Sequence, residues 1–102
     1  MTRHQSSLIF QIRSGHFPVN VFLHRINKSD TSICQKCNAE DEVQEETISH
    51  FLFECTAYTR QRRDLARAIG HNNLDLRNIM AQSKRMKALA KYIVKTGRLV
   101  TP

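Results

Sequence analysis

The sequence predicts a small all-α domain, and three observations support this prediction. Apolar residues recur at helical spacing in one segment after another. No alternating strand pattern is longer than a knuckle turn, and three glycines and two prolines are too few for a turn-rich all-β fold. A chain of 102 residues has room for one hydrophobic core. Residues 1–102 are therefore expected to form a single domain, a bundle of about five helices.

The first helix is predicted from its caps. Thr2 and Gln5 have the spacing of a capping box, and Gly15 is a plausible helix end. An apolar stripe lies between them, formed by Leu8, Ile9 and Ile12. These signals predict a helix that starts after Thr2 and ends at Gly15.

The second helix is predicted to start at Pro18, because proline suits the first position of a helix. An amphipathic pattern follows at i, i+3, i+4 and i+7, formed by Val19, Phe22, Leu23 and Ile26. The polar residues 27–30 end this helix.

The remaining helices are predicted in the second half of the chain. Thr47 can cap a short helix through the segment "ISHFLF". A longer helix covers about residues 58–69, and Gly70 ends it. A short helical turn is expected at residues 75–82. Ser83 is the predicted cap of the last helix, which Gly97 ends.

All three cysteines lie in the segment "SICQKCNAEDEVQEETISHFLFEC", together with one histidine. Cys34 and Cys37 form a CxxC turn, and His50 and Cys55 follow with four residues between them. A CxxC turn is the usual way to offer two thiols to one tetrahedral ion, and three thiolates with one imidazole fill the coordination of zinc. The pattern predicts a closed, structural Zn²⁺ site with no open position for catalysis.

The geometry of a helix restricts how His50 and Cys55 can share an ion. Positions five apart on an α-helix differ by about 140°. We therefore expect His50 on the short helix and Cys55 just beyond its end. The alternative to a metal site is that the cysteines are simply buried and His50 lies on the surface. A redox CxxC is less favoured, because no βαβ pattern surrounds it.

The charge is unevenly distributed along the chain. The whole chain carries +7, but residues 34–55 carry a net −5 and residues 56–102 carry eleven basic and two acidic residues, a net +9. The acidic residues of the 40–46 loop lack EF-hand spacing and are expected to be flexible and solvated. The basic C-terminal half favours a polyanionic partner.

The basic residues form two stripes at helical spacing. On the last helix Lys84, Lys87, Lys91 and Lys95 lie opposite the apolar residues, and on the preceding long helix Arg60, Arg63 and Arg67 repeat the pattern. Such stripes can follow a phosphate backbone, and no aromatic residue interleaves with them. They predict largely sequence-independent binding of RNA or DNA. The alternative is that each stripe only solvates the outer face of its helix.

The residues around the predicted site resemble those of a known family. The phrases "IRSGHFPVNVFLHRI", "EETISHFLFEC", "AYTRQRRDL" and "ALAKYIVKTGRL" and the CxxC turn are similar to the C-terminal zinc-binding segment of LINE-type (non-LTR) retrotransposon polyproteins, especially fungal ones. In that family the segment follows the reverse transcriptase and RNase H regions. The resemblance implies that Cys34, Cys37, His50 and Cys55 are zinc ligands and that the segment handles nucleic acid.

Two features depart from the family pattern. The loop between Cys37 and His50 is longer and more acidic than the family leads one to expect, and Thr56 stands where the family often has proline. Two origins are open, a fragment of a polyprotein or a free-standing protein derived from the element. In the second case the chain could be a protein-interaction module, such as a regulator or a pathogen effector, that pairs with another protein or with itself.

The remaining expectations concern activity and location. Nothing in the sequence suggests a nucleophile with its base, a catalytic carboxylate pair or a phosphate-binding glycine loop, so the chain is not expected to be an enzyme. Its N-terminus is too polar for a signal peptide, and its apolar runs are too short to cross a membrane. The expected location is inside the cell, nuclear or cytoplasmic, where cysteines stay reduced.

Overall fold

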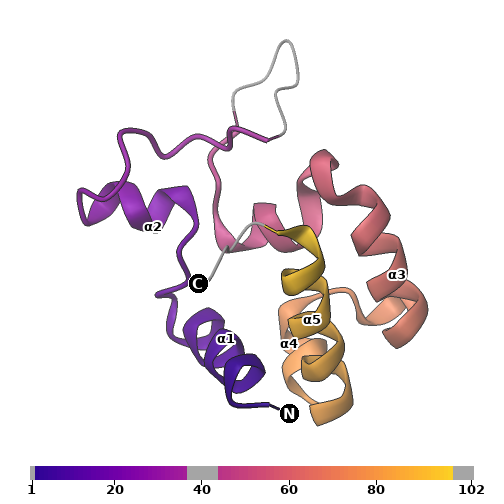
Figure 1. Cartoon of the computed structure of the whole chain (residues 1–102). Helices are drawn as coiled ribbons and strands as arrows, with labels where there is room; N and C mark the ends of the chain where they lie inside the picture. Colours follow the sequence, from indigo (N-terminus) through magenta and orange to yellow (C-terminus); the bar gives the residue numbers. More distant parts are fainter. Residues whose placement is uncertain (1, 37–43, 98–102) are drawn as a thin grey trace.

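The computed structural model describes residues 2–36 and 44–97, and it confirms the all-α fold (Figure 1). Within these ranges the α-helices are α1 (Arg3–Ser14), α2 (Asn20–Arg25), α3 (Thr59–Ile69), α4 (Leu76–Met80) and α5 (Ser83–Thr96). A π-helical turn η1 (His50–Glu54) and two 3₁₀ turns, η2 (Thr56–Tyr58) and η3 (His71–Asn73), complete the helical elements.

The first helix forms as its caps predict. The Thr2 hydroxyl accepts a hydrogen bond from the Gln5 amide at 3.1 Å, and the Gln5 side chain accepts one from the Thr2 amide at 3.1 Å. At the other end Gly15 has φ +80°, a left-handed conformation that glycine adopts without a steric cost. The capping box and the glycine stop are both confirmed.

Two predicted helix starts are wrong. Helix α2 begins at Asn20, after Pro18, because the Glu46 carboxylate accepts a hydrogen bond from the Asn20 amide at 2.7 Å and Val19 is still extended. Ser83 does not cap α5. It is the first residue of that helix, and the extended residue before it, Gln82, makes no side-chain cap bond.

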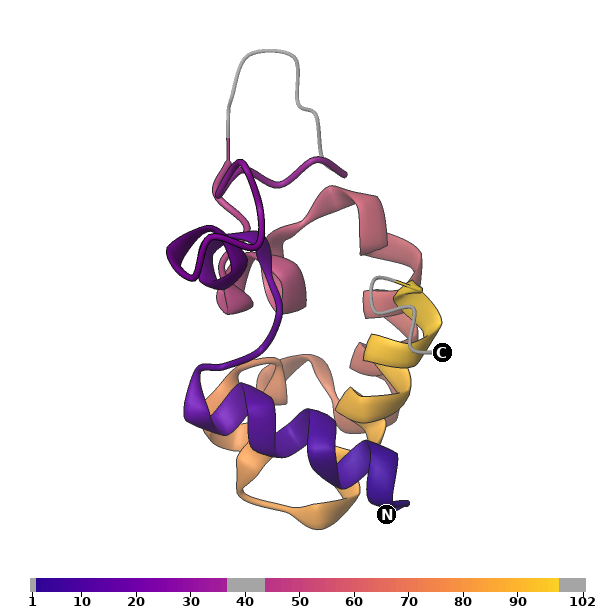
Figure 2. The ribbon, with the colours of Figure 1, turned by 60° about the vertical axis from the view of Figure 1, so that its left-hand side comes forward.

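Helix α5 is the centre of the bundle, since α1, α3 and α4 all pack against it (Figures 1 and 2). Its inner face is buried, and contributes Leu89, Ala90, Tyr92 and Ile93 to the core. An aromatic cluster joins this face to η1. The centroid of the Phe51 ring lies 5.6 Å from that of Phe17, 5.4 Å from that of Tyr58 and 6.0 Å from that of Tyr92.

A short knuckle stands at one end of the molecule, beside α2 (Figure 2). Here residues 32–34 pair with residues 44–46 through hydrogen bonds from the Cys34 amide to the Gln44 carbonyl at 2.7 Å and from the Glu46 amide to the Ser32 carbonyl at 2.9 Å. The pairing is antiparallel and amounts to one bridge, between Ile33 and Glu45. Across the residues that the structure describes, no longer strand forms.

Candidate metal centre

Three of the four predicted ligands come together in the core. Cys34 arrives from the knuckle, His50 is the first residue of η1, and Cys55 follows the end of that turn. All three side chains are buried, and their sulfur and nitrogen donor atoms lie within 4.8 Å of one another. His50 is only 5% exposed, which contradicts the alternative of a surface histidine. The cluster is close enough to bind one metal ion.

The spacing of the two sulfurs fits a shared ion. The Sγ atoms of Cys34 and Cys55 are 3.8 Å apart. Two sulfurs each about 2.3 Å from one tetrahedral zinc lie roughly 3.8 Å apart. A disulfide would need about 2.05 Å. Cysteine sulfur and imidazole nitrogen are also the donors of most structural zinc sites, so the cluster is compatible with zinc.

Cys37 lies outside the described residues, so its part in the site stays a prediction. The acidic residues at 40–42 lie outside them too. Two acids of that loop are described. Glu45 is exposed as expected, whereas Glu46 is 1% exposed. The prediction that the acidic side chains of this loop are solvated is wrong for Glu46. Its carboxylate accepts a hydrogen bond from the Asn20 amide, and its backbone carbonyl accepts one from the Val21 amide at 3.1 Å. Glu46 therefore fastens α2 to the knuckle.

A wide helical turn brings His50 and Cys55 to one point. The Cys55 amide donates to the His50 carbonyl at 2.7 Å, an i→i+5 bond. This π-type turn places residue i+5 nearly above residue i, whereas an α-helix would turn the two side chains about 140° apart. The Thr47 hydroxyl caps the start of this helical segment by accepting a hydrogen bond from the His50 amide at 3.0 Å. The predicted arrangement of His50 on the turn and Cys55 just beyond it is confirmed.

Two carbonyls of this turn are bound by side chains from two other helices. Arg62 of α3 donates through Nε to the Leu52 carbonyl at 2.9 Å and through Nη2 to the Phe51 carbonyl at 3.4 Å. Tyr92 of α5 donates its hydroxyl to the Phe51 carbonyl at 2.8 Å and accepts from Arg62 at 3.3 Å. A cation also suits the negative end of a helical turn. Arg62 and Tyr92 thus attach the ligand-bearing turn to α3 and α5.

The Tyr92 hydroxyl stays protonated at any physiological pH. Burial raises the pKa of Tyr92 to about 12, and the positive charge of Arg62 opposes part of this rise. The hydroxyl is therefore a permanent donor to Phe51, and the attachment of η1 to α5 does not depend on pH in the physiological range.

Replacement of Arg62 by alanine is expected to lower the free energy of unfolding by about 2 kcal/mol, because hydrogen bonds from a charged donor are lost and two carbonyls lose a partner. The matched control is its neighbour Arg63, which is exposed and belongs to the basic stripe. Urea unfolding followed by circular dichroism measures both. Equal stability of Arg62→Ala and Arg63→Ala would contradict the role given to Arg62.

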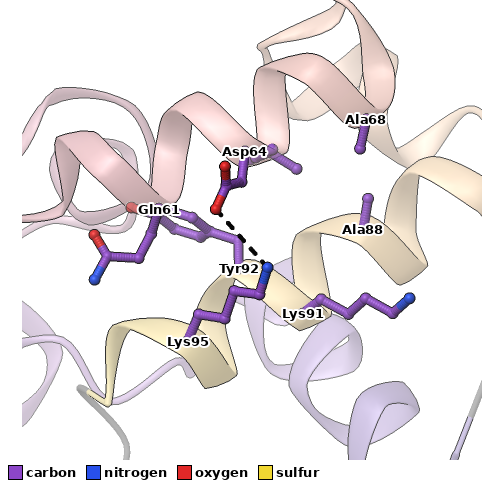
Figure 3. Close-up of a pocket in the computed structure, with 8 residues that line it drawn as sticks. Gln61, Asp64, Ala68, Ala88, Lys91, Tyr92 and Lys95 are labelled. Atoms are coloured by element: carbon purple, nitrogen blue, oxygen red, sulfur yellow. Dashed lines mark ion pairs between the residues drawn. The ribbon is translucent and has the colours of Figure 1, made fainter.

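The structure places both basic stripes on the outside of the bundle. All seven predicted nucleic-acid contacts are exposed: Arg60, Arg63, Arg67, Lys84, Lys87, Lys91 and Lys95. Helices α3 and α5 run antiparallel, with Ala68 facing Ala88 near one end of the seam and Gln61 near Lys95 at the other (Figure 3). The hollow between the two helices measures only about 70 Å³, room for a water molecule or two.

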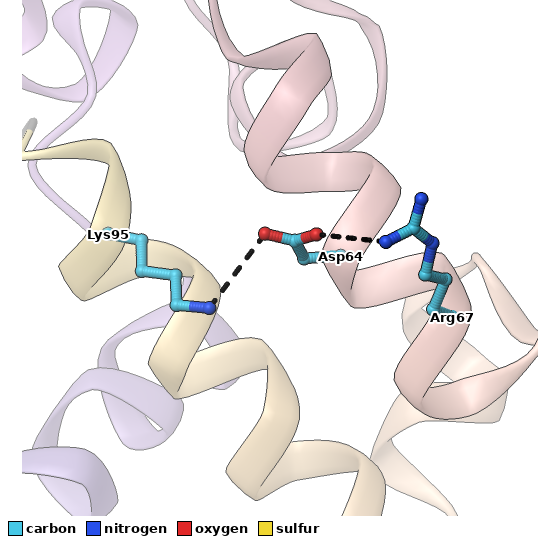
Figure 4. A network of polar contacts seen from close by, with 3 residues as sticks. All are labelled: Asp64, Arg67 and Lys95. Carbon is cyan, nitrogen blue, oxygen red and sulfur yellow. Dashed lines mark ion pairs between the residues drawn. The ribbon is translucent and has the colours of Figure 1, made fainter.

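Asp64 lies where the two stripes meet. Its carboxylate is 3.9 Å from Arg67 on its own helix and 3.9 Å from Lys95 on α5 (Figure 4). Both pairs are well exposed, so they contribute little to stability. Their importance is geometric, because they show that the arginine stripe and the lysine stripe adjoin on one surface.

Sequence reasoning missed the structural roles of Arg62, Tyr92 and Glu46. The helical periodicity of the apolar residues in α3 could have identified Arg62. It lies three residues before the buried Leu65 and therefore on the inner side of the helix. Tyr92 likewise falls on the buried face of α5. Glu46 had no such signal, because its partner lies 26 residues away.

No helix within residues 2–36 and 44–97 is long and apolar enough to span a membrane. Comparison with protein-family models, with curated proteins and with solved structures finds no match for this chain.

Proposed function

We propose that the chain is a zinc-stabilised module that binds RNA or DNA through the outer faces of α3 and α5, largely without sequence preference. The observation that carries the proposal is the set of seven exposed basic side chains on two antiparallel helices that meet at Asp64. The resemblance to the retrotransposon segment supports the same function, and the origin proposed for the chain is such an element.

Zinc has a structural role in this proposal. Cys34, His50 and Cys55 supply three ligands and Cys37 the fourth, which leaves no open position for water or substrate. The proposal assigns no catalytic residue, and the module is not an enzyme. Because a reducing compartment keeps cysteine thiols free to bind metal, the proposed location is inside the cell.

The metal centre and the basic surface are connected through named contacts. The π-helical turn carries two ligands, and its carbonyls bind Arg62 of α3 and Tyr92 of α5. Zinc at the centre would fix this turn, and the turn in turn orients the two helices that carry the stripes. The metal therefore supports binding without touching the nucleic acid.

The exposed lysines predict a steep dependence of affinity on salt. Here K is the association constant for the probe, and the slope of log K against log[salt] is negative. In the Lys87→Ala/Lys91→Ala variant its magnitude is expected to decrease by about 0.9 per lost phosphate contact on duplex probes and by about 0.7 on single strands. Fluorescence anisotropy with labelled 20-nucleotide RNA and DNA probes, single- and double-stranded, measures this. Asp64→Asn removes a repulsive charge from the same surface and is expected to strengthen binding.

The control is Arg77→Ala, which removes an exposed cation of α4 that belongs to neither stripe. It is expected to leave the slope nearly unchanged. The proposal fails if the folded, zinc-loaded protein shows no salt-dependent binding to any probe at low salt, or if Arg77→Ala weakens binding as much as the double variant.

A further inference from the structure

Asp64 is the only acidic residue of α3 and α5, and it lies between the two basic stripes. Its carboxylate is 3.9 Å from Arg67 of the arginine stripe on one side and 3.9 Å from Lys95 of the lysine stripe on the other (Figure 4). All three groups face solvent, since their side chains are 49–73% exposed. The protein therefore places an anion of its own midway between two sets of cations.

The Asp64 carboxylate stands where a single strand would gain most from the surface. A flexible chain of phosphates is attracted most strongly where cations of both stripes reach it, which is along the seam between α3 and α5. At the centre of that seam the carboxylate already neutralises one cation of each stripe, and it repels a phosphate. The charge of Asp64 thus works against a strand that follows the seam.

The seam also offers no place for an unpaired base. The hollow along it measures about 70 Å³, which admits no base, and Tyr92, the aromatic residue that lines it, is buried. Single strands usually gain affinity by stacking their bases on exposed aromatic rings. The guanidinium groups of the arginine stripe can stack on bases, whereas the lysine stripe offers charge alone. A single strand therefore engages one stripe at a time.

The two stripes run side by side along the seam. The antiparallel helices bring Ala68 opposite Ala88 at one end and Gln61 near Lys95 at the other (Figure 3). The arginine stripe consequently lies opposite the last three lysines of the lysine stripe, while Lys84 lies beyond the end of α3. Within each stripe a cation recurs every three or four residues, a rise of about 4.5–6 Å. The surface presents two parallel rows of positive charge with one acid between them.

A double helix presents the complementary arrangement. Its two backbones are rows of phosphates separated by grooves about 6 and 12 Å wide in B-DNA. The axes of packed helices lie about 8–10 Å apart, so stripes on two neighbouring helices match this scale. When each stripe contacts one backbone, Asp64 faces the groove between the phosphates, where the amino groups of the bases are donors that a carboxylate accepts.

We infer that the α3–α5 surface binds double-stranded nucleic acid across a groove, with one basic stripe on each backbone, and that Asp64 discriminates against single strands. The inference rests on the proposed function and names its substrate class. The discrimination comes from a repulsive group as much as from attractive ones. Duplex RNA and duplex DNA share the two rows of phosphates, so the experiment includes both.

The first test removes two cations from one stripe at a time in the zinc-loaded chain. The variants are Arg60→Ala/Arg63→Ala and Lys87→Ala/Lys91→Ala, and fluorescence anisotropy gives the salt slope with 20-base-pair DNA and RNA duplexes and with 20-nucleotide single strands. On a duplex each double variant is expected to reduce the magnitude of the slope by about 1.8, and the two combined by about twice that. On a single strand each double variant alone is expected to change the slope by less than about 0.7, because the strand moves to the other stripe.

The matched control is Arg3→Ala/Arg77→Ala, which removes two exposed cations of α1 and α4 that belong to neither stripe. It is expected to change the duplex slope by less than one phosphate contact, about 0.9. Circular dichroism checks that every variant keeps its helicity. Each variant is compared with the unmodified chain on the same probe, because the denser charge of a duplex strengthens its binding to any basic surface.

The second test is Asp64→Asn, which keeps the size of the side chain and removes its charge. The affinity for single strands is expected to rise at least about threefold more than the affinity for duplexes, because the seam becomes open to a phosphate chain. Asp30→Asn is the matched control, since Asp30 is an exposed acid outside α3 and α5. It is expected to leave the ratio of the two affinities unchanged.

Three results would overturn the inference. The first is a duplex slope that responds to one stripe only, with the other double variant indistinguishable from Arg3→Ala/Arg77→Ala. The second is an equal gain of affinity for single strands and duplexes in Asp64→Asn. The third is binding of single strands without binding of duplexes, which would leave the proposed function standing. Absence of binding to every probe at low salt would instead contradict the proposed function itself.

Discussion

A chelator that removes zinc is expected to unfold most of the chain. Structural zinc binds zinc-finger peptides with an apparent free energy of about 10–16 kcal/mol, whereas a whole domain is stable by only about 5–15 kcal/mol. The three candidate ligands lie in the core beside the aromatic cluster of Phe51, so metal release is expected to remove the metal bonds and to loosen the packing around them. Metal content by mass spectrometry and helicity by circular dichroism are expected to fall together.

Single substitutions sharpen this experiment. Cys34→Ser and His50→Ala remove buried ligands and are expected to lose zinc and helicity, whereas His4→Ala changes an exposed histidine of α1 and is expected to change neither. A Cys34→Ser protein that keeps its helicity without zinc would contradict a structural role for the metal. Zinc retained by Cys37→Ser at full affinity would instead remove Cys37 from the ligand set.

Phe51→Ala is expected to lower the free energy of unfolding by about 4 kcal/mol. Phe51 is fully buried, contacts three other aromatic rings and follows a ligand directly in sequence. Its loss leaves a cavity between η1, α5 and the segment around Phe17. For a domain of this size the corresponding drop in Tm is about 16 °C or more, which a thermal melt measures.

Phe10→Ala is the matched control for this prediction, because it removes the same ring from an exposed position of α1. It is expected to shift the Tm by no more than a few degrees, since surface substitutions change stability by about 0.5 kcal/mol or less. Similar melts for Phe10→Ala and Phe51→Ala would mean that the aromatic cluster does not hold the core together.

Local signals predicted the helices well because the chain uses ordinary caps. The Thr2 and Gln5 side chains bind each other's backbone, and Gly15, Gly70 and Gly97 all have positive φ at or just after helix ends. One of the two errors arose where a distant residue decides the boundary. Helix α2 starts at Asn20 because Glu46, from the far side of the knuckle, supplies its cap.

The sequence predicts the residues of the candidate metal site well, but it does not predict the side chains that hold these residues in place. Residue type and spacing identified Cys34, His50 and Cys55, and the angular argument placed Cys55 past the end of the turn. Spacing could not show that Arg62 and Tyr92 bind the carbonyls of that turn, because these contacts join residues 10 to 41 positions apart. Such pairings depend on how the helices pack, which a pattern along one helix does not encode.

The wide turn at η1 also fixes the length of the segment between its ligands. Among the four residues from Phe51 to Glu54, only Glu54 is exposed and can change in identity with little effect on packing. The loss of one residue would return the turn to α-helical register, and the gain of one would rotate Cys55 away from His50. Insertions and deletions should therefore be absent from this segment in any chain that keeps the site. A family descended from this sequence would show a stretch of constant length that keeps apolar residues at the buried positions of Phe51 and Leu52, in contrast to loops that vary in both length and residue type.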